Sequence, residues 1–344
     1  MTEPQQSPAL STPACPSAMM FRQRLGFFPI NLFTITMGLG GLSIAWEKLA
    51  VVTRAAAPLG LLLGSLNSLV FLFLLGSYLY KWVLHRQRAA AEFQHPVLLH
   101  FFPAVSISLL LLSVFWQKNT SVALALWLGG AVMQLSLTLY VVVQWLSRSV
   151  FTLASSNPVW FIPVVGNIIA PITGSFLGYT DVSWLFFFIG LISWALLTVM
   201  LVFRLLYFAP LPPPLVPTLV IFLAPPSIGF VAYTALTGVL DIYAKGLFSI
   251  AVCIALALAV QTFRFARLPF SLSSWAYSFP LAALTIAFFQ FAQLSGILFF
   301  WWIAILLLGV TTGIIAWLTL NTLRAYRCNK ICVPEAPINT ASQP

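Results

Sequence analysis

Five prolines stand inside long apolar stretches of the chain, where each could leave a backbone carbonyl free to bind an ion. Phe or Ile directly precedes four of them. The five segments read Phe27-Phe28-Pro29, Phe101-Phe102-Pro103, Phe161-Ile162-Pro163, Leu223-Ala224-Pro225 and Ser278-Phe279-Pro280. A proline inside a helix removes one backbone hydrogen bond, and in lipid only protein or water can satisfy the freed carbonyl. We therefore expect these stretches to kink and to face an interior.

Neutral polar side chains follow the prolines on the same stretches. They include Asn31, Thr34, Thr36, Ser106, Ser108, Asn167, Thr173, Ser175, Ser227, Thr234 and Thr285. Hydroxyls, amides and freed carbonyls can replace water around a partly dehydrated ion without a fixed countercharge. The acidic residues number six, and none lies in the middle of an apolar stretch. Because no acidic ring would attract cations, the pattern favours an anion.

The bulky residue before a kink could close such a path. Phe28, Phe102 and Phe279 occupy equivalent positions before their prolines, and phenyl groups at a constriction exclude water and ions. We predict that Phe279 is the main gate. Ordinary packing between helices is the alternative for each of these rings.

Few residues suit other chemistry. His100 is the one histidine near a path, where it could link transport to protons, although an interface histidine is the simpler interpretation. Asp241 and Lys245 have the spacing of a helix cap with an ion pair. We identify no nucleophile motif, metal-ligand spacing or cofactor fingerprint, and Cys328 and Cys332 fit reduced thiols best. No catalytic residue, metal or cofactor is expected, and an enzyme is excluded.

Composition places these residues in a membrane. Of 344 residues, 61% are hydrophobic and only 6% charged, whereas soluble domains carry roughly 25% charged residues. The apolar runs are continuous, which predicts helices and argues against a barrel. The basic residues behind the net charge of +10 are scattered between the runs, so they indicate topology and not binding to nucleic acid.

Ten membrane-spanning helices are expected within a transmembrane domain at residues 22–325, between cytoplasmic tails at 1–21 and 326–344; the first tail is expected to be disordered. The spans lie near 25–46, 58–82, 97–116, 121–144, 159–178, 181–205, 215–237, 242–263, 273–294 and 297–323. The prolines fall in every odd span, so the repeat is a helical hairpin. Five parallel hairpins predict an all-α fold, with an inner ring of kinked odd helices around a central pore.

The basic residues also predict the orientation. With the N-terminus inside the cell, twelve of the 16 fall on the cytoplasmic side, and only Lys48, Arg54, Lys118 and Lys245 fall outside. We expect a multi-pass protein of the cell inner (plasma) membrane with both termini in the cytoplasm.

Several motifs resemble one known family when taken in order. They are Gly38-Leu39-Gly40-Gly41-Leu42-Ser43-Ile44-Ala45-Trp46, His95-Pro96-Val97, Leu177-Gly178-Tyr179-Thr180-Asp181, Leu223-Ala224-Pro225, Asp241 to Lys245, and Ser274-Trp275-Ala276-Tyr277-Ser278-Phe279. The chain resembles the tellurite-resistance/dicarboxylate transporter family, which includes bacterial TehA and the plant guard-cell slow anion channels. The resemblance implies ten helices, a homotrimer with one pore per subunit, and a phenylalanine at position 279 that occludes the pore. One departure is that no Glu-Pro follows Trp194.

Two functions remain open at this point. The first is a passive channel for chloride- or nitrate-like anions with a phenylalanine gate. The alternative is a proton-coupled carrier for malate-like dicarboxylates, or an exporter of tellurite or sulfite, as other branches of the family imply. The carrier needs a titrating group on the path, and His100 is the nearby candidate.

Overall fold

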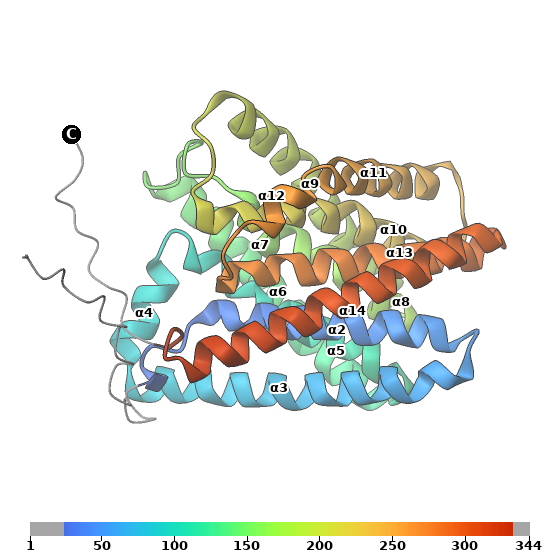
Figure 1. The fold of residues 1–344 in the computed structure, drawn as a ribbon, viewed down its shortest axis with the longest axis horizontal. Helices are drawn as coiled ribbons and strands as arrows, with labels where there is room; N and C mark the ends of the chain where they lie inside the picture. Colours follow the sequence, from blue (N-terminus) through green and yellow to red (C-terminus); the bar gives the residue numbers. More distant parts are fainter. Residues whose placement is uncertain (1–23, 333–344) are drawn as a thin grey trace, which may run out of the picture.

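The computed structural model describes residues 24–332, and within that range the chain forms helices and no strands. The expected tail at 1–21, and the second tail beyond residue 332, lie outside the described residues. Figure 1 shows long helices lying side by side, joined by short connections at the two ends of the bundle. The α-helices are α2 (Phe33–Ala50), α3 (Ala57–Leu84), α4 (Arg86–Gln94), α5 (Pro103–Phe115), α6 (Thr120–Ser147), α7 (Phe161–Val165), α8 (Ala170–Phe176), α9 (Thr180–Tyr207), α10 (Ala224–Thr237), α11 (Ile242–Ala259), α12 (Thr262–Ala266), α13 (Ser278–Ser295) and α14 (Leu298–Arg327). Short 3-10 helices join them: η1 (Ile30–Leu32), η2 (Arg54–Ala56), η3 (Leu98–Phe101), η4 (Trp116–Lys118), η5 (Pro158–Trp160), η6 (Gly166–Ile169), η7 (Pro213–Leu223) and η8 (Leu272–Tyr277).

Nine helical segments in the described part of the chain are long and apolar enough to cross a membrane. They are Arg54–Leu84, Leu98–Lys118, Thr120–Ser147, Pro158–Phe176, Thr180–Tyr207, Pro213–Thr237, Ile242–Val260, Leu272–Ser295 and Leu298–Arg327. The expectation of ten is therefore met only in part. The first expected span corresponds to η1 and α2, which is not among the nine, and α2 carries the charged residues Glu47 and Lys48 in its last turn.

Burial alternates along the chain. In Leu98–Lys118, Pro158–Phe176, Pro213–Thr237 and Leu272–Ser295, between 72% and 83% of the most apolar window is buried. In the other five segments the buried share is only 22% to 33%. Helix α2 is buried along most of its length, from Phe33 to Ala45. The segments that contain signature prolines thus form the interior, and the other five helices turn apolar side chains outward, where lipid would solvate them.

The prolines themselves do not interrupt α-helices. Pro103, Pro163, Pro225 and Pro280 lie in the first turn of α5, α7, α10 and α13, and Pro29 is the N-cap of η1. In each segment a 3-10 helix comes before the α-helix, and in the first segment Pro29 stands at the start of that 3-10 helix. The prediction of mid-helix kinks is therefore corrected to a junction between 3-10 and α-helix. Proline is tolerated in a first turn because the N–H groups there have no acceptor within the helix.

Neighbouring helices satisfy the carbonyl groups at these junctions. The Pro163 carbonyl accepts hydrogen bonds from Gln134 Nε2 at 2.8 Å and from Thr138 Oγ1 at 2.6 Å, both on α6. The Phe28 carbonyl accepts one from Lys81 Nζ at 2.7 Å. These carbonyls are bonded within the protein, so they are not free to bind an ion.

A close approach of α2 and α13 depends on Gly38. A Cβ atom at this position would overlap the Ser278 side chain, including its rigid Cβ atom. We expect Gly38→Val to force the helices apart and to lower the free energy of unfolding by about 1–3 kcal/mol, as overpacking of cores does. Thermal unfolding of the purified protein in detergent measures the loss. Gly76→Val on α3 is the matched control, because a Cβ at Gly76 meets nothing within 4 Å; equal losses in both variants would contradict the packing argument.

Candidate functional site

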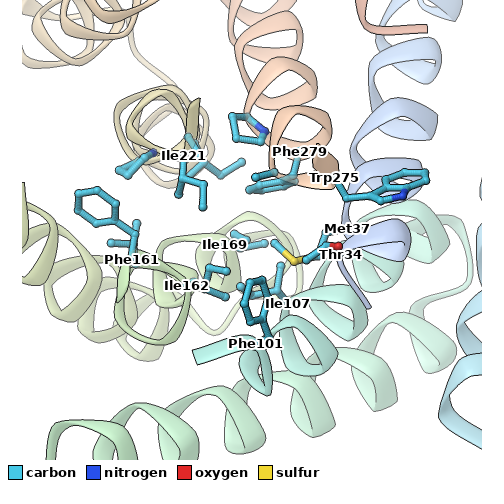
Figure 2. Close-up of a pocket in the computed structure, with 17 residues that line it drawn as sticks. Thr34, Met37, Phe101, Ile107, Phe161, Ile162, Ile169, Ile221, Trp275 and Phe279 are labelled. Atoms are coloured by element: carbon cyan, nitrogen blue, oxygen red, sulfur yellow. The ribbon is translucent and has the colours of Figure 1, made fainter. Parts of the chain in front are cut away.

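A small cavity of about 60 Å³ lies where the five proline segments meet. Figure 2 shows its lining side chains converging from separate helices. The lining residues are Thr34, Met37, Phe101, Ile107, Phe161, Ile162, Val165, Gly166, Ile169, Ile221, Ala224, Pro225, Ile228, Trp275, Ala276, Phe279 and Pro280. All of them are uncharged and most are apolar. We call this space the central cavity; it offers an ion almost no polar partner.

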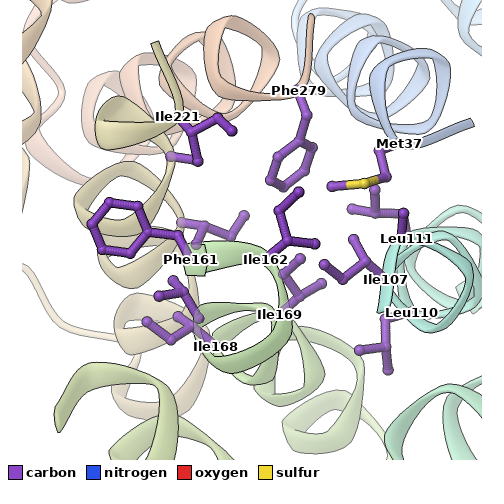
Figure 3. Close-up of a cluster of buried hydrophobic side chains, with 14 of the residues drawn as sticks. Met37, Ile107, Leu110, Leu111, Phe161, Ile162, Ile168, Ile169, Ile221 and Phe279 are labelled. Carbon is purple, nitrogen blue, oxygen red and sulfur yellow. The ribbon is translucent and has the colours of Figure 1, made fainter. Parts of the chain in front are cut away.

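Phe279 occupies the middle of the central cavity. Figure 3 shows its ring pointing from α13 into the space between Ile162, Ile221 and Met37. The side chain is 8% exposed. Behind it, the ring's Cδ2 atom lies 3.5 Å from the position that a Cβ at Gly41 would take. A glycine at that position therefore leaves the ring room beside α2.

The other two predicted gate residues lie elsewhere. Phe28 lines a separate cavity together with Arg24. Phe102 packs edge-to-face against Phe93, with ring centroids 4.7 Å apart. Its neighbour Phe101 lines the central cavity in its place. Successive residues of a 3-10 helix point about 120° apart, so only one of the two rings can face the axis.

Only some of the signature prolines line the central cavity, as is true of the predicted gate residues. Pro225 and Pro280 line the central cavity, and Pro29 lines a different cavity near α4. Pro103 and Pro163 are buried but are not among the residues that line these cavities. The five prolines thus mark equivalent junctions, although only two of them contact the central space.

A second cavity, of about 480 Å³, opens toward the end of the bundle where α2 passes into α3. We call it the α2-end cavity. Residues from α2, α5 with η4, α8, α10 and α13 line it: Ile44, Glu47, Lys48, Val51, Leu111, Val114, Gln117, Ile172, Ser175, Phe176, Ile228, Val231, Ala235, Ile286 and Gln290. Ile228 lines both this cavity and the central cavity. The same five segments therefore surround two neighbouring spaces, a large one and a small one.

A third cavity, of about 660 Å³, lies at the opposite end and contains a buried ion pair that the sequence did not indicate. Lys81 Nζ lies 2.7 Å from Glu92 Oε1, and the Tyr78 hydroxyl donates to Glu92 Oε2 at 2.9 Å. The Lys81 side chain is only 1% exposed. In the sequence, Lys81 is one of the twelve basic residues expected on the cytoplasmic side, and Glu92 is one of the six acidic residues outside the middle of the apolar stretches. The available signal was that Glu92 is the one acidic residue between the second and third expected spans.

Comparison with known proteins identifies the family. The family model described as "Voltage-dependent anion channel", named SLAC1, matches residues 27–323, a range that includes all five proline segments. The chain belongs to the SLAC1 family. The resemblance to TehA and the plant slow anion channels is thereby confirmed, and the family consists of membrane channels and transporters, not enzymes.

Individual members of the SLAC1 family are similar over most of this chain. The S-type anion channel SLAH3 of Arabidopsis thaliana is 30% identical over 273 residues, which are 77% of this chain and 43% of that protein. The guard cell S-type anion channel SLAC1 of the same plant is 29% identical, over 77% of this chain and 50% of its own. The tellurite resistance protein TehA homolog of Haemophilus influenzae is 28% identical over 86% of this chain and 90% of its own. The chain spans about half the length of the plant channels that it matches.

His100 does not line the cavities of this SLAC1-family protein that are described above. It is fully buried, and its ring lies next to those of Trp145 and Trp160 at centroid distances of 5.7 Å and 5.3 Å, while the two tryptophan rings stack on each other at 4.8 Å. Trp145 Nε1 donates to His100 Nε2 at 2.8 Å. Because that nitrogen accepts a hydrogen bond, the geometry fits a neutral imidazole in an aromatic cage.

Asp241 acts as the helix cap that its spacing predicts. Its Oδ1 accepts from the Ala244 amide at 2.9 Å, at the start of α11. The expected ion pair with Lys245 is wrong: within residues 24–332 the only ion pair is Lys81–Glu92. Asp241 Oδ2 accepts from the Tyr233 hydroxyl at 2.6 Å. The Ala244 amide, and after it the Tyr233 hydroxyl, hold the pKa of the Asp241 carboxyl below its usual value.

Proposed function

We propose that the chain forms a passive channel for small monovalent anions such as chloride and nitrate, and that Phe279 closes it. One observation carries the proposal: the Phe279 ring points into a small uncharged cavity between the helical segments that also surround the wider α2-end cavity. An apolar constriction of this kind holds back ions by excluding water. Family membership supports transport of an anion.

The proposal includes the finer architecture. We count α2 as a tenth span, because its buried face and its place beside α13 match the other proline segments. Five parallel hairpins would then form a domain over 22–325, with the proline segments inside. The family resemblance also supports a homotrimer with one pore per subunit. The distribution of basic residues supports insertion in the plasma membrane with both termini in the cytoplasm.

A proton-coupled malate carrier, or an exporter of tellurite or sulfite, is the second candidate. Similarity to the tellurite resistance protein TehA homolog favours it. A carrier of this kind needs a group that titrates on the path. The residues that line the central cavity, where Phe279 would close the path, include none; Glu47 and Lys48 line only the wider α2-end cavity, and His100 sits in its aromatic cage outside both. The passive channel is therefore the better supported function.

Flux through reconstituted liposomes separates the two candidates. We expect the protein, and more strongly its Phe279→Ala variant, to pass chloride and nitrate down their gradients whether or not a pH gradient is imposed. Sulfite and malate are tested in parallel, and His100→Gln is expected to leave the chloride and nitrate fluxes unchanged. Malate uptake that requires the pH gradient and disappears in His100→Gln would instead establish the carrier.

A further inference from the structure

The α2-end cavity contains a lysine without a carboxylate partner. Lys48, near the end of α2, donates from Nζ to Gln290 Oε1 on α13 at 2.6 Å. No acidic oxygen within residues 24–332 lies within 4.0 Å of its ammonium group, since the ion pair there is Lys81–Glu92. An ammonium group has three donors. The hydrogen bond to Gln290 uses one of these donors, so two N–H groups of Lys48 and its positive charge remain for a ligand.

The neighbouring carboxylate, that of Glu47, also lines the α2-end cavity, but it forms no ion pair with Lys48. The Cγ atom of Glu47 lies 3.0 Å from where a Cβ on Gly60 would be, so this side chain packs against the start of α3. Lys118, at the end of η4, interacts electrostatically with Glu47. Successive residues of an α-helix point about 100° apart, so the side chains of Glu47 and Lys48 leave α2 in different directions. Lys48 is the cation and Glu47 the carboxylate among the residues that line the cavity, and Lys118 at the same end offsets the charge of Glu47.

Other donors stand around the same space. When Gln290 turns its oxygen to Lys48, its amide nitrogen remains as a donor. Gln117 and Ser175 line the cavity from two further segments, with only long hydrogen bonds of 3.4–3.5 Å to their neighbours. The remaining walls are mostly apolar. Charge interactions are stronger beside such walls than in bulk water.

We propose that Lys48 and Gln290 form an anion-binding site in the α2-end cavity, which takes up a chloride- or nitrate-sized anion on the side of the path away from α4. The ammonium supplies the charge, and the amide nitrogen of Gln290 supplies a directed donor. The role of this site in permeation rests on the proposed channel function, whereas anion binding itself does not. At low ionic strength the site would concentrate anions next to the Phe279 constriction.

Two variants test the site without removing a wall of the cavity. Lys48→Gln removes the charge and keeps a polar side chain. Gln290→Glu keeps Lys48 but places a carboxylate beside it. This carboxylate would form an ion pair with the Lys48 ammonium and so exclude a free anion. Lys245→Gln is the matched control, since Lys245 is an exposed lysine on α11 that does not line the cavity.

Binding is measured first, as the rise in melting temperature of the full-length protein in detergent when sodium nitrate replaces sodium gluconate. A ligand that binds only the folded state raises that temperature. We expect a rise in the wild type and in Lys245→Gln, and its loss in Lys48→Gln and Gln290→Glu. Equal rises in all four proteins, or no rise in any, would overturn the site.

Conductance is measured second, with each variant combined with Phe279→Ala. The half-saturating nitrate concentration should increase about tenfold in the Lys48→Gln and Gln290→Glu combinations and stay unchanged with Lys245→Gln. If Phe279→Ala alone conducts no anion, the channel proposal fails while the melting data still decide the binding site. If Phe279→Ala conducts and its half-saturation does not depend on Lys48, the site fails and the channel stands.

Discussion

Replacing Phe279 by alanine is expected to raise the anion conductance of the protein by about 10- to 100-fold. The Phe279 ring points into the central cavity, and its removal would enlarge that cavity by the volume of the ring. Each 1.4 kcal/mol removed from a barrier is a factor of ten in rate, so loss of one phenyl constriction suffices for this effect. Current in planar bilayers or oocytes measures it, with surface expression quantified in parallel.

The control for this experiment is Phe289→Ala on the same helix. Phe289 is buried like Phe279, but its ring faces Trp301 of α14 at a centroid distance of 5.6 Å and does not line the central cavity. We expect Phe289→Ala to change stability and to leave conductance near the wild-type level. Equal conductance in both variants would mean that any loosening of α13 opens the path, which would contradict a specific role for Phe279.

Replacing Glu92 by alanine is expected to lower the free energy of unfolding by about 3–5 kcal/mol. The variant leaves the Lys81 ammonium buried with a carbonyl, that of Phe28, as its remaining hydrogen-bond partner. The Tyr78 hydroxyl also loses its acceptor. Thermal unfolding in detergent, together with the yield of folded protein, measures the loss.

A double variant shows whether the loss comes from the unpaired charge. Lys81→Met combined with Glu92→Ala removes both charges, and we expect it to be more stable than Glu92→Ala alone. If the double variant were less stable than the single one, the buried pair would not explain the effect. The ion pair lies next to the Phe28–Pro29 junction, so unfolding of this end would loosen the start of α2.

The amino-acid sequence predicted the parts of the fold that follow from solvent and backbone chemistry. Apolar length predicted membrane helices, and the prolines indicated which segments would be buried, although they stand in first helical turns and do not break a hydrogen bond within an α-helix. Phe279, at the end of the W-A-Y-S-F motif, lines the central cavity, and its role as a gate stays a prediction. The first span is less clear in the structure, since charged Glu47 and Lys48 belong to the same helix as its apolar residues.

The sequence could not specify how side chains are directed at the junctions. Whether Phe101 or Phe102 faces the cavity depends on the local 3-10 register, and both residues look alike in the sequence. The pair of Lys81 and Glu92 depends on how α4 folds back against α3. The pair of Lys48 and Gln290 joins residues 242 positions apart. Such contacts require the packing of whole helices to be known.

The reversal potential of the Phe279→Ala current tests the central claim most directly. With unequal concentrations of sodium chloride on the two sides of a bilayer, current through an anion path reverses at the equilibrium potential of chloride. We predict that value for Phe279→Ala, with much smaller current in the wild type and in Phe289→Ala. A reversal potential near that of sodium, or no current from folded Phe279→Ala protein, would contradict an anion channel closed by Phe279.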